Sequence, residues 1–317
     1  RNLLGRRHLI GIGLGLALVA LVGWVSFEVA LTGAILFAQH RIARNRRFAR
    51  IGLGTMRLPR PMILGRWQVA AWAYIALVAL CSTGLPLLVL GHWMRLGLPD
   101  MNWLRLGQTA AATFLTAAPS AMITIILALP VVVLGLRYPG RLAASVDRLA
   151  YLGYATPALA FALALVFFTL GTAPFLYQSF FVLIFAYVMS LLAMAFAPIR
   201  LALLQVGPRQ EEAARTLGAT AAGAFRRVVL PRLRAPIVAG GLLVFIMVVK
   251  ELPMTYMLAP AGYGTLATNV FARTSEGMMQ EAAPYALSII LFSALFVGLI
   301  LKYEGQGQRS LAPAKYR

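Results

Sequence analysis

Lys250 and Glu251 stand side by side in an apolar stretch of the sequence and are followed by Pro253. An ionisable group at mid-membrane costs at least about 2.5–3.5 kcal/mol, so such residues serve transport or reach an interface. Because neighbours on a helix point about 100° apart, we expect each side chain to have a partner on another helix or to face water. Two interpretations remain open: a gate or substrate path, and a snorkelling interfacial lysine beside a helix-ending proline.

The other residues able to do chemistry do not form a catalytic or metal-binding set. Glu28 is the one acid in the first apolar stretch, and we expect it to face the interior of a bundle. Tyr151 and Tyr154 are candidates for lining a pathway. The histidines share no helical spacing, Cys81 lies inside an apolar stretch, and no lysine follows a Gly-rich phosphate-binding loop. The sequence therefore predicts no metal site, no bound cofactor and no ATP hydrolysis by this chain.

The composition excludes most classes of soluble protein. Of 317 residues, 61% are hydrophobic and 12% are charged, whereas soluble domains average about 45–50% and about 25%. One cysteine cannot build a disulfide scaffold, and an apolar excess of this size disfavours a soluble enzyme or a disordered chain. We predict an all-α protein, a polytopic bundle of about seven membrane-spanning helices.

Seven stretches are long enough to cross a bilayer, which takes about 20 mostly apolar residues. They cover residues 9–38, 68–91, 110–136, 149–171, 177–199, 236–259 and 284–301. The expected organisation is a membrane helix over 1–38, a basic linker over 39–67, six spans over 68–303 and a tail over 304–317. The linker has eight arginines and no acid, and it serves either as a hinge between two membrane units or as a topology anchor.

Basic residues are divided unevenly between the two sets of connections. The net charge is +20, and 22 lysines and arginines fall on one side of the expected spans against six on the other. Since cytoplasmic loops carry the excess of positive charge, the loop 200–235 and the C-terminus are predicted to be cytoplasmic. Three arginines near the N-terminus fall on the outer side. Either they lie in a loop between spans of a longer protein, or the first span is assigned incorrectly.

This cytoplasmic loop has helix signals of its own. Pro208 suits the first turn of a helix, and Glu211 and Glu212 then place negative charge near its positive end. Gly218 is expected to stop this helix, and a second short helix is expected to follow until Pro231 ends it. The loop is therefore predicted to be a helix–turn–helix at the cytoplasmic surface.

The first of these two helices favours a protein partner over lipid. Its apolar face is small, with Ala213, Ala214 and Leu217, and this suits close approach of a backbone better than deep insertion into a membrane. Anionic lipid would also repel its acidic end. An amphipathic connector that rests on lipid headgroups is the alternative.

The spacing of these residues resembles the EAA signature of type I, binding-protein-dependent ABC importer permeases. The matching positions are Glu212-Ala213-Ala214, Gly218 and Val228-Val229-Leu230-Pro231. In that family the segment forms coupling helices that dock into a groove on a cytoplasmic ATPase. The residues to which the resemblance gives an ATPase-coupling role are Glu211, Glu212, Ala213, Ala214, Gly218, Leu230 and Pro231.

A narrower resemblance, to ferric-iron-type importer permeases, extends over most of residues 60–303. The matches are Tyr138-Pro139-Gly140-Arg141, residues 149–154, Lys250-Glu251-Leu252-Pro253, residues 265–268 and Ser275-Glu276-Gly277. Such permeases usually carry two six-span halves, each with its own coupling segment, whereas this sequence has one such segment and one additional span. The resemblance implies a C-terminal half preceded by the last helix of the first half; a complete chain would need a homodimer.

The resemblance also implies partners and a location. It implies a permease fold in the bacterial inner membrane, with a separate cytoplasmic ATPase dimer that carries ATP and Mg²⁺. A periplasmic binding protein would deliver ferric iron, with oxyanion, polyamine, thiamine and phosphonate importers as alternatives. A second permease half and membrane lipid are further expected partners, and nucleic acid is not.

Two interpretations from other classes stand beside the importer. An ion-coupled secondary transporter would use Glu28 and the Lys250–Glu251 pair as its coupling site and would need no ATPase. A membrane-embedded enzyme is the third, although no catalytic set is visible in the sequence. The requirement for an ATPase partner distinguishes the importer from the secondary transporter.

Overall fold

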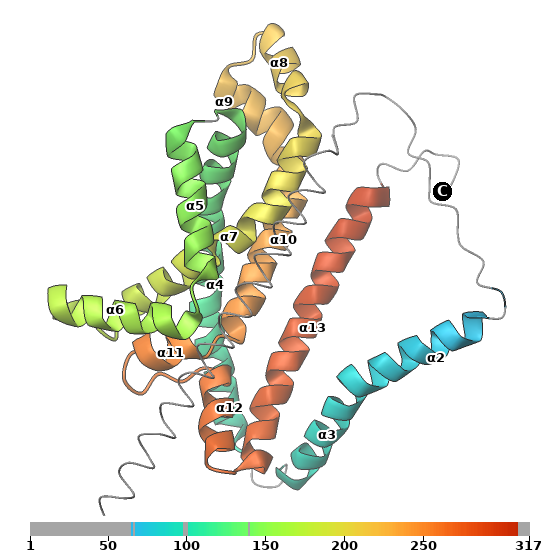
Figure 1. The fold of residues 1–317 in the computed structure, drawn as a ribbon, viewed down its shortest axis with the longest axis vertical. Helices are drawn as coiled ribbons and strands as arrows, with labels where there is room; N and C mark the ends of the chain where they lie inside the picture. Colours follow the sequence, from blue (N-terminus) through green and yellow to red (C-terminus); the bar gives the residue numbers. More distant parts are fainter. Residues whose placement is uncertain (1–64, 66, 98–100, 139, 310–317) are drawn as a thin grey trace, which may run out of the picture. The chain divides into compact units, whose positions relative to one another are not determined.

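The computed structural model describes residues 65, 67–97, 101–138 and 140–309, and every regular element in these residues is helical (Figure 1). The chain divides into two compact units, Arg1–Gln68 and Val69–Arg317. The helices described below belong to the second unit, apart from the first two residues of α2. The expected membrane helix over 1–38, with Glu28, and nearly all of the linker over 39–67 lie outside the described residues.

Twelve α-helices and three short π or 3₁₀ turns make up the described part of the chain. In order they are α2 (Trp67–Ala79), η1 (Leu80–Gly84), α3 (Leu85–Gly97), α4 (Trp103–Arg137), α5 (Arg141–Ala155), α6 (Ala158–Thr172), η2 (Pro174–Leu176), α7 (Phe180–Val206), α8 (Pro208–Thr216), α9 (Ala221–Ala224), η3 (Phe225–Val229), α10 (Leu230–Val249), α11 (Pro253–Leu258), α12 (Leu266–Ser275) and α13 (Met279–Arg309).

Five continuous helical runs in the described residues are long and apolar enough to cross a membrane. They are Trp67–Gly97, Trp103–Arg137, Phe180–Val206, Ala221–Val249 and Met279–Lys302. The expected stretches 68–91, 110–136 and 284–301 fall inside these runs, and 177–199 coincides with a fourth except at its start. The predicted all-α, polytopic bundle is therefore confirmed, with helices that extend beyond the apolar stretches.

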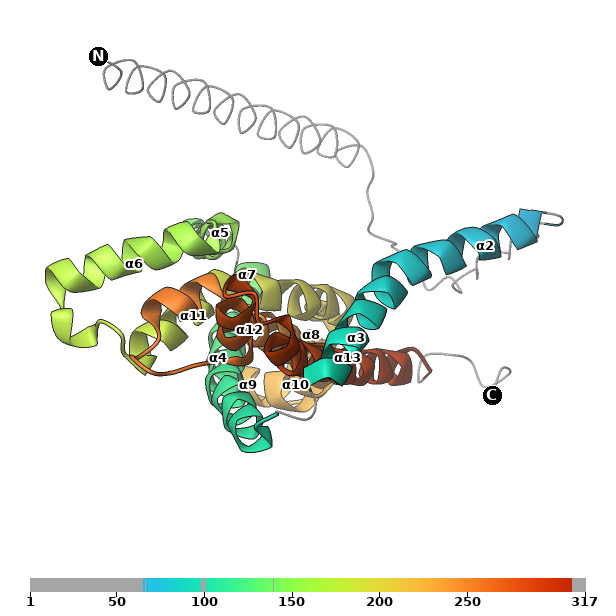
Figure 2. The ribbon, with the colours of Figure 1, turned by 90° about the horizontal axis from the view of Figure 1, so that it is seen from below.

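The stretch expected to span at 149–171 is bent, because α5 and α6 together are long and apolar enough for a membrane span but meet at an angle of 106°. Thr156 has an extended ψ of 129°, and Pro157 follows it as the N-cap of α6. A proline pushes the residue before it out of the helical region and lacks the N–H that would continue the helix. Figure 1 shows α5 running along the bundle while α6 crosses it, and Figure 2 shows α6 extending outward.

The stretch expected to span at 236–259 also differs from the structure. α10 ends at Val249, and Lys250, with φ −100° and ψ 1°, is its C-cap. Pro253 then opens the separate short helix α11, in the first turn, where a helix tolerates proline. The helix therefore does not continue through Pro253, as expected, but α10 already ends at Val249, four residues before the proline.

α4, α7 and α10 form the centre of the bundle and lie side by side in both ribbon views (Figures 1 and 2). The largest fully buried side chains of α7 are Leu183, Tyr187, Phe196, Ile199 and Leu203. Gly240 of α10 lies where the three helices meet, because a Cβ atom there would be 3.2 Å from Cγ of Pro198 and 3.3 Å from Cδ1 of Ile125. Small residues at such crossings let the helix backbones approach closely.

One face of α4 carries a row of buried hydroxyl groups. They belong to Thr109, Thr113, Thr116, Ser120 and Thr124. Each hydroxyl donates to a backbone carbonyl about one turn earlier in the same helix, at 2.7–3.0 Å. Thr113 additionally accepts a hydrogen bond from the backbone N–H of Leu266 at 2.9 Å, and the Tyr263 hydroxyl donates to the Ala112 carbonyl. These two bonds join α4 to the first residue of α12 and to the loop before it.

α5 is held against α7 by a close backbone approach and by an ion pair. A Cβ atom on Gly153 would lie 2.6 Å from the carbonyl oxygen of Met189, so only glycine fits without displacement. Asp147 of α5 also pairs with Arg200 of α7. The two contacts hold α5 along α7 between Met189 and Arg200.

Candidate functional site

The chain leaves α7 through a sharp turn. Gly207 has a positive φ of 62°, a conformation that favours glycine. α8 follows with Pro208 in its first turn and Glu211 as the acid there, as the sequence predicts. The first expected helix of the loop 200–235 is therefore confirmed.

The expected glycine stop is confirmed as well. Gly218 has a φ of 89°, and its N–H donates to the carbonyl of Arg215 at 3.0 Å. The next N–H, from Ala219, donates to the carbonyl of Ala214 at 3.1 Å. This pair of bonds is a Schellman motif, which satisfies carbonyls that the end of α8 would leave unpaired. We call residues 207–220 the α8 segment.

The second expected helix does not end at Pro231, which corrects the prediction. Thr220 caps α9 by accepting a hydrogen bond from the N–H of Gly223 at 3.1 Å, and the π turn η3 then leads directly into α10. In that turn the N–H of Leu230 bonds to the carbonyl of Phe225, five residues earlier. A proline ring normally clashes with the carbonyl four residues before it, and the wider π turn leaves space for it. Pro231 therefore lies near the start of a long helix.

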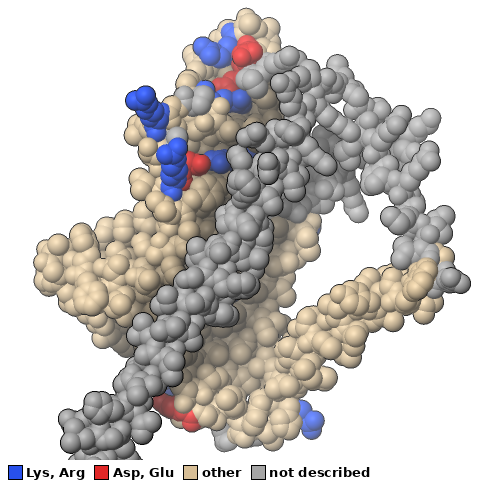
Figure 3. Space-filling view, in the orientation of Figure 1, with Lys and Arg blue, Asp and Glu red and all other residues tan. Residues whose placement is uncertain are grey.

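The outer side of the α8 segment is exposed. Glu212, Ala213 and Leu217 are all exposed, and Leu217 leaves 89% of its surface uncovered. Ala213 and Leu217 lie one turn apart and so share a face, while Ala214 is half-buried. Figure 3 shows acidic and basic side chains gathered around this end of the molecule. The segment thus presents a carboxylate beside a small apolar surface.

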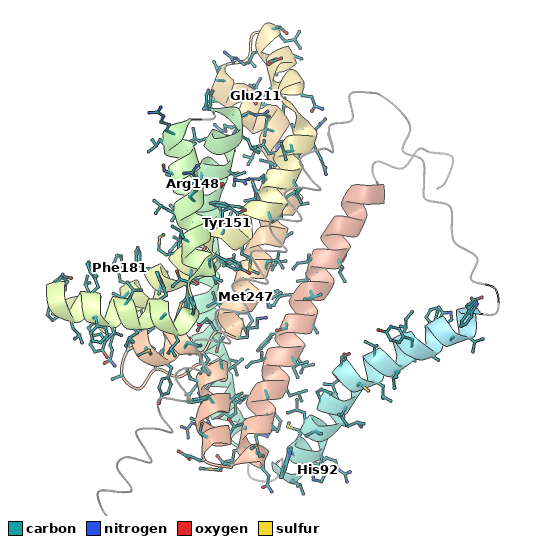
Figure 4. All side chains as sticks on the ribbon, in the orientation of Figure 1. His92, Arg148, Tyr151, Phe181, Glu211 and Met247 are labelled. Atoms are coloured by element: carbon teal, nitrogen blue, oxygen red, sulfur yellow. The ribbon has the colours of Figure 1, made fainter. Side chains whose placement is uncertain are left out.

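The inner side of α8 is tied to two helices of the bundle. Glu211, labelled in Figure 4, pairs with Arg137 at the end of α4, with 3.3 Å between Oε2 and Nε and with 23% and 16% of the two side chains exposed. Arg137 also donates to the carbonyl of Gly207 at 3.4 Å. Arg232 of α10 donates to the side chain of Gln210. The two adjacent glutamates of α8 therefore have opposite environments.

The Lys250–Glu251 pair lies at the junction of α10 and α11. The two side chains do not pair: Lys250 is exposed, whereas Glu251 is half-buried, and its two carboxylate oxygens accept from the N–H of Met254 at 3.3 and 3.2 Å. Glu251 thereby supplies an acceptor to the unpaired first N–H groups of α11. Thr255 donates to the Glu251 carbonyl at 2.9 Å and shares a 2.5 Å hydrogen bond with the hydroxyl of Tyr187 on α7.

The predicted site residues form separate groups. Tyr151 and Tyr154 are exposed on α5, where the Tyr151 ring (labelled in Figure 4) lies edge-on to Phe196 with 6.1 Å between centroids. Leu230 and Pro231 begin α10 beside the α8 segment, and Lys250 caps its other end, about 30 Å away at 20 residues of helix. The structure brings the coupling candidates together and keeps them apart from the α10–α11 junction.

Sequence reasoning missed two arginines. Arg137 is not among the predicted site residues, although an arginine in the last turn of one helix and an acid in the first turn of another are complementary to the helix dipoles. Arg273 of α12 donates to Oδ1 of Asn269 at 2.6 Å, donates to the Tyr285 hydroxyl at 3.2 Å and lies 3.4 Å from Glu281. It joins α12 to α13, and its i,i+4 spacing from Asn269 was the available signal.

These features define a multi-pass membrane protein whose helical bundle carries a short exposed helix at one end. The family model described as "binding-protein-dependent transport system inner membrane component" matches residues 132–303, from the last turns of α4 into α13. The chain belongs to this family. The resemblance to ABC importer permeases is thereby confirmed at the level of the family.

Individual relatives agree with this assignment. The Fe(3+)-transport system permease protein FbpB 2 of Haemophilus influenzae is 34% identical over 239 residues, which cover 74% of this chain and 47% of the relative. The chain thus spans about half the length of that curated relative.

Solved structures share the fold at low sequence identity. A chain of a bacterial alginate ABC transporter, in complex with a periplasmic protein bound to alginate pentasaccharide, gives a TM-score of 0.57 at 16% identity and covers 77% of this chain and 94% of its own. A chain of the MetNI methionine ABC transporter gives 0.51 at 19% identity, covering 67% of this chain and 100% of its own. The fold of this chain is therefore that of ABC transporter permeases.

Proposed function

We propose that the chain is a transmembrane subunit of an ATP-driven importer and that a separate cytoplasmic ATPase docks on its α8 segment. The observation that carries the proposal is the outward face of α8, where Glu212, Ala213 and Leu217 are exposed within the residues that the family model matches. A groove on the ATPase would bury the apolar pair and set the carboxylate against a basic group, while Gly218 permits the turn that presents this face.

A movement of the α8 segment would be transmitted to the membrane helices. Leu230 and Pro231 continue the segment into α10 without a break in the helix. Ala214 is small and half-buried, so α8 can lie close to the neighbouring turns. The partner ATPase dimer would bind ATP and Mg²⁺ and perform the hydrolysis, with this chain as the moving element.

The proposed setting is the bacterial inner membrane, with the α8 segment and the C-terminus in the cytoplasm. The excess of arginine in the connections on that side supports this orientation. Residues 1–38 would be the last span of a preceding half, 39–67 a cytoplasmic linker, 68–303 the permease half and 304–317 a cytoplasmic tail. The match to about half of a longer relative supports a second half on the same longer chain, and a homodimer is the alternative.

Ferric iron delivered by a periplasmic binding protein is the proposed cargo, and the name of the 34% identical relative supports it. In the described residues no three His, Cys, Asp or Glu side chains lie close enough to hold a metal ion. The proposal therefore assigns recognition of the ion to the binding protein, and passage to this chain. Another cargo of the same importer class would leave the docking proposal unchanged.

The α10–α11 junction is the proposed gate. From Arg234 to Lys250 the helix rises about 24 Å, which leaves Lys250 at or near the outer boundary of the apolar core. Lys250 is exposed and has no ion pair among the described residues. An ammonium group at this depth must contact water or an acidic partner, because contact with hydrocarbon is costly. The break before Pro253 and the cap by Glu251 provide a joint, and Tyr151 and Tyr154 would line the path.

Cysteine crosslinking tests the docking proposal. Single cysteines at positions 208–222, in a Cys81→Ser background, would be crosslinked in membranes that contain the complete transporter. We expect adducts at 212, 213 and 217 with a polypeptide that mass spectrometry identifies by its phosphate-binding loop as an ABC ATPase. Adducts with phospholipid alone, or transport that continues without any ATPase, would reject the proposal in favour of an ion-coupled carrier.

Accessibility of position 250 tests the gate. In the Cys81→Ser background, Lys250→Cys is expected to react with a charged, membrane-impermeant methanethiosulfonate reagent on the order of tenfold faster than Leu291→Cys, because the reactive thiolate forms in water. Leu291 is an exposed apolar residue of α13 and serves as the control for a lipid-facing surface. Equal rates at the two positions would show that Lys250 faces the lipid interface.

A further inference from the structure

The two adjacent glutamates of α8 cannot have the same task. Glu211 is half-buried and pairs with Arg137, whereas Glu212 is exposed and has no ion pair among the described residues. A carboxylate that is already paired with the permease is not available to a partner protein without losing that bond. The docking face and the anchoring face of α8 are therefore separate.

Arg137 holds the start of α8 from two sides. Its guanidinium lies 3.3 Å from the Glu211 carboxylate and donates to the carbonyl of Gly207 at 3.4 Å, so it contacts both the N-cap and the first turn. The cation ends α4 and the anion begins α8, which is the favourable arrangement for both helix dipoles. Because both side chains are mostly covered, solvent screens the pair less than it screens an open surface pair.

α4 is suited to receive a displacement from α8. It is 35 residues long, about 50 Å, and it packs against both α7 and α10. Near its other end Thr113 is bonded to Leu266, the first residue of α12, and the Ala112 carbonyl to Tyr263 in the loop before it. A rigid contact at Arg137 would thus link the α8 segment to the opposite end of the bundle through one helix.

We propose that Arg137 and Glu211 are positioning residues that make α8 and α4 move as one body, so that a push on the outer face of α8 displaces α4 instead of rotating α8 in place. The inference rests on the proposed function for the source of the push. Without the ion pair, the ATPase would still bind the outer face of α8, but the movement of α8 would not be transmitted to α4.

Charge reversal and a charge-conserving variant test the inference in the complete transporter reconstituted in lipid vesicles. Glu211→Arg and Arg137→Glu are each expected to lower the amount of cargo moved per ATP hydrolysed at least about fivefold, with the affinity for the ATPase changed less than about threefold. Arg137→Lys, which keeps a cationic donor at the end of α4, is expected to retain at least half of the coupling. A fall in ATPase affinity equal to that of Glu212→Lys, or a loss of coupling in Arg137→Lys as large as in Arg137→Glu, would overturn the inference.

Hydrogen exchange of the chain alone, in nanodiscs, supplies a readout that needs no partner. Amides of residues 210–217 are expected to exchange roughly two- to fivefold faster in Glu211→Gln than in the wild type, while Glu212→Gln leaves them unchanged. Equal exchange in Glu211→Gln and the wild type would overturn the inference even if an ATPase docks. If the wild type binds no ATPase, the proposed function fails, and this measurement still decides whether the ion pair holds α8.

Discussion

Replacing Glu212 with lysine is expected to weaken binding of the ATPase roughly 30- to 1,000-fold, which corresponds to about 2–4 kcal/mol at a desolvated interface residue. Glu212 is exposed on the outer face of α8, next to Ala213 and one turn from Leu217. The substitution reverses a charge without disturbing the ion pair of Glu211, so the helix itself should persist. The affinity of the purified ATPase for the chain in nanodiscs is the measurement.

Two further variants make this result specific. Leu217→Asp is expected to weaken binding to a similar extent, because Leu217 is 89% exposed and its burial would contribute apolar contact. Glu276→Lys makes the same charge change on an exposed residue that caps α12, away from α8, and is expected to leave the affinity within about twofold. If Glu212→Lys and Leu217→Asp both bind normally, α8 is not the docking surface.

Gly153→Val is expected to destabilise the bundle by about 1–3 kcal/mol or more, the usual cost of overpacking. A Cβ atom at this position would lie 2.6 Å from the carbonyl oxygen of Met189 and 3.4 Å from its carbonyl carbon, and both are backbone atoms that cannot move aside. α5 would have to separate from α7, which also strains the ion pair between Asp147 and Arg200. The expected fall in melting temperature is on the order of 2–12 °C, measured in detergent by tryptophan fluorescence.

Gly107→Val is the matched control for this variant. Gly107 also lies inside a helix, α4, but nothing lies within 4 Å of a Cβ atom built there. The two variants share the gain in side-chain volume and the change in helix propensity, and differ in the steric contact. If both lower the melting temperature equally, the close approach of α5 and α7 does not hold the two helices together.

The membrane helices and the start of the α8 segment could be predicted from the sequence because their signals are local. Long apolar stretches marked the spans at α4 and α13, and a proline with two acids marked the first turn of α8. Gly218 was recognised as a stop because few other residues adopt the positive φ that a Schellman motif requires. Each of these features depends on residues within one or two turns.

The errors arose where neighbouring backbone geometry decides the outcome. Pro157 breaks a span and Pro231 does not, although both are prolines in helical sequence. Pro231 follows the π turn η3, and this local backbone geometry cannot be seen in composition. The separation of Glu211 from Glu212 was likewise hidden, because the partner of Glu211 is 74 residues away in the chain.

The hydroxyl row of α4 has a mechanical consequence. Since all five hydroxyls donate within their own helix, none of them has a proton left to donate to α7 or α10. A displacement of α4 along its axis would therefore break none of these five bonds, and resistance would come from side-chain packing, such as that of Ile125 against Gly240. Among the described residues, such a displacement would act on the bonds of Thr113 to Leu266 and of the Ala112 carbonyl to Tyr263, and on the contacts of Arg137 with Glu211 and Gly207.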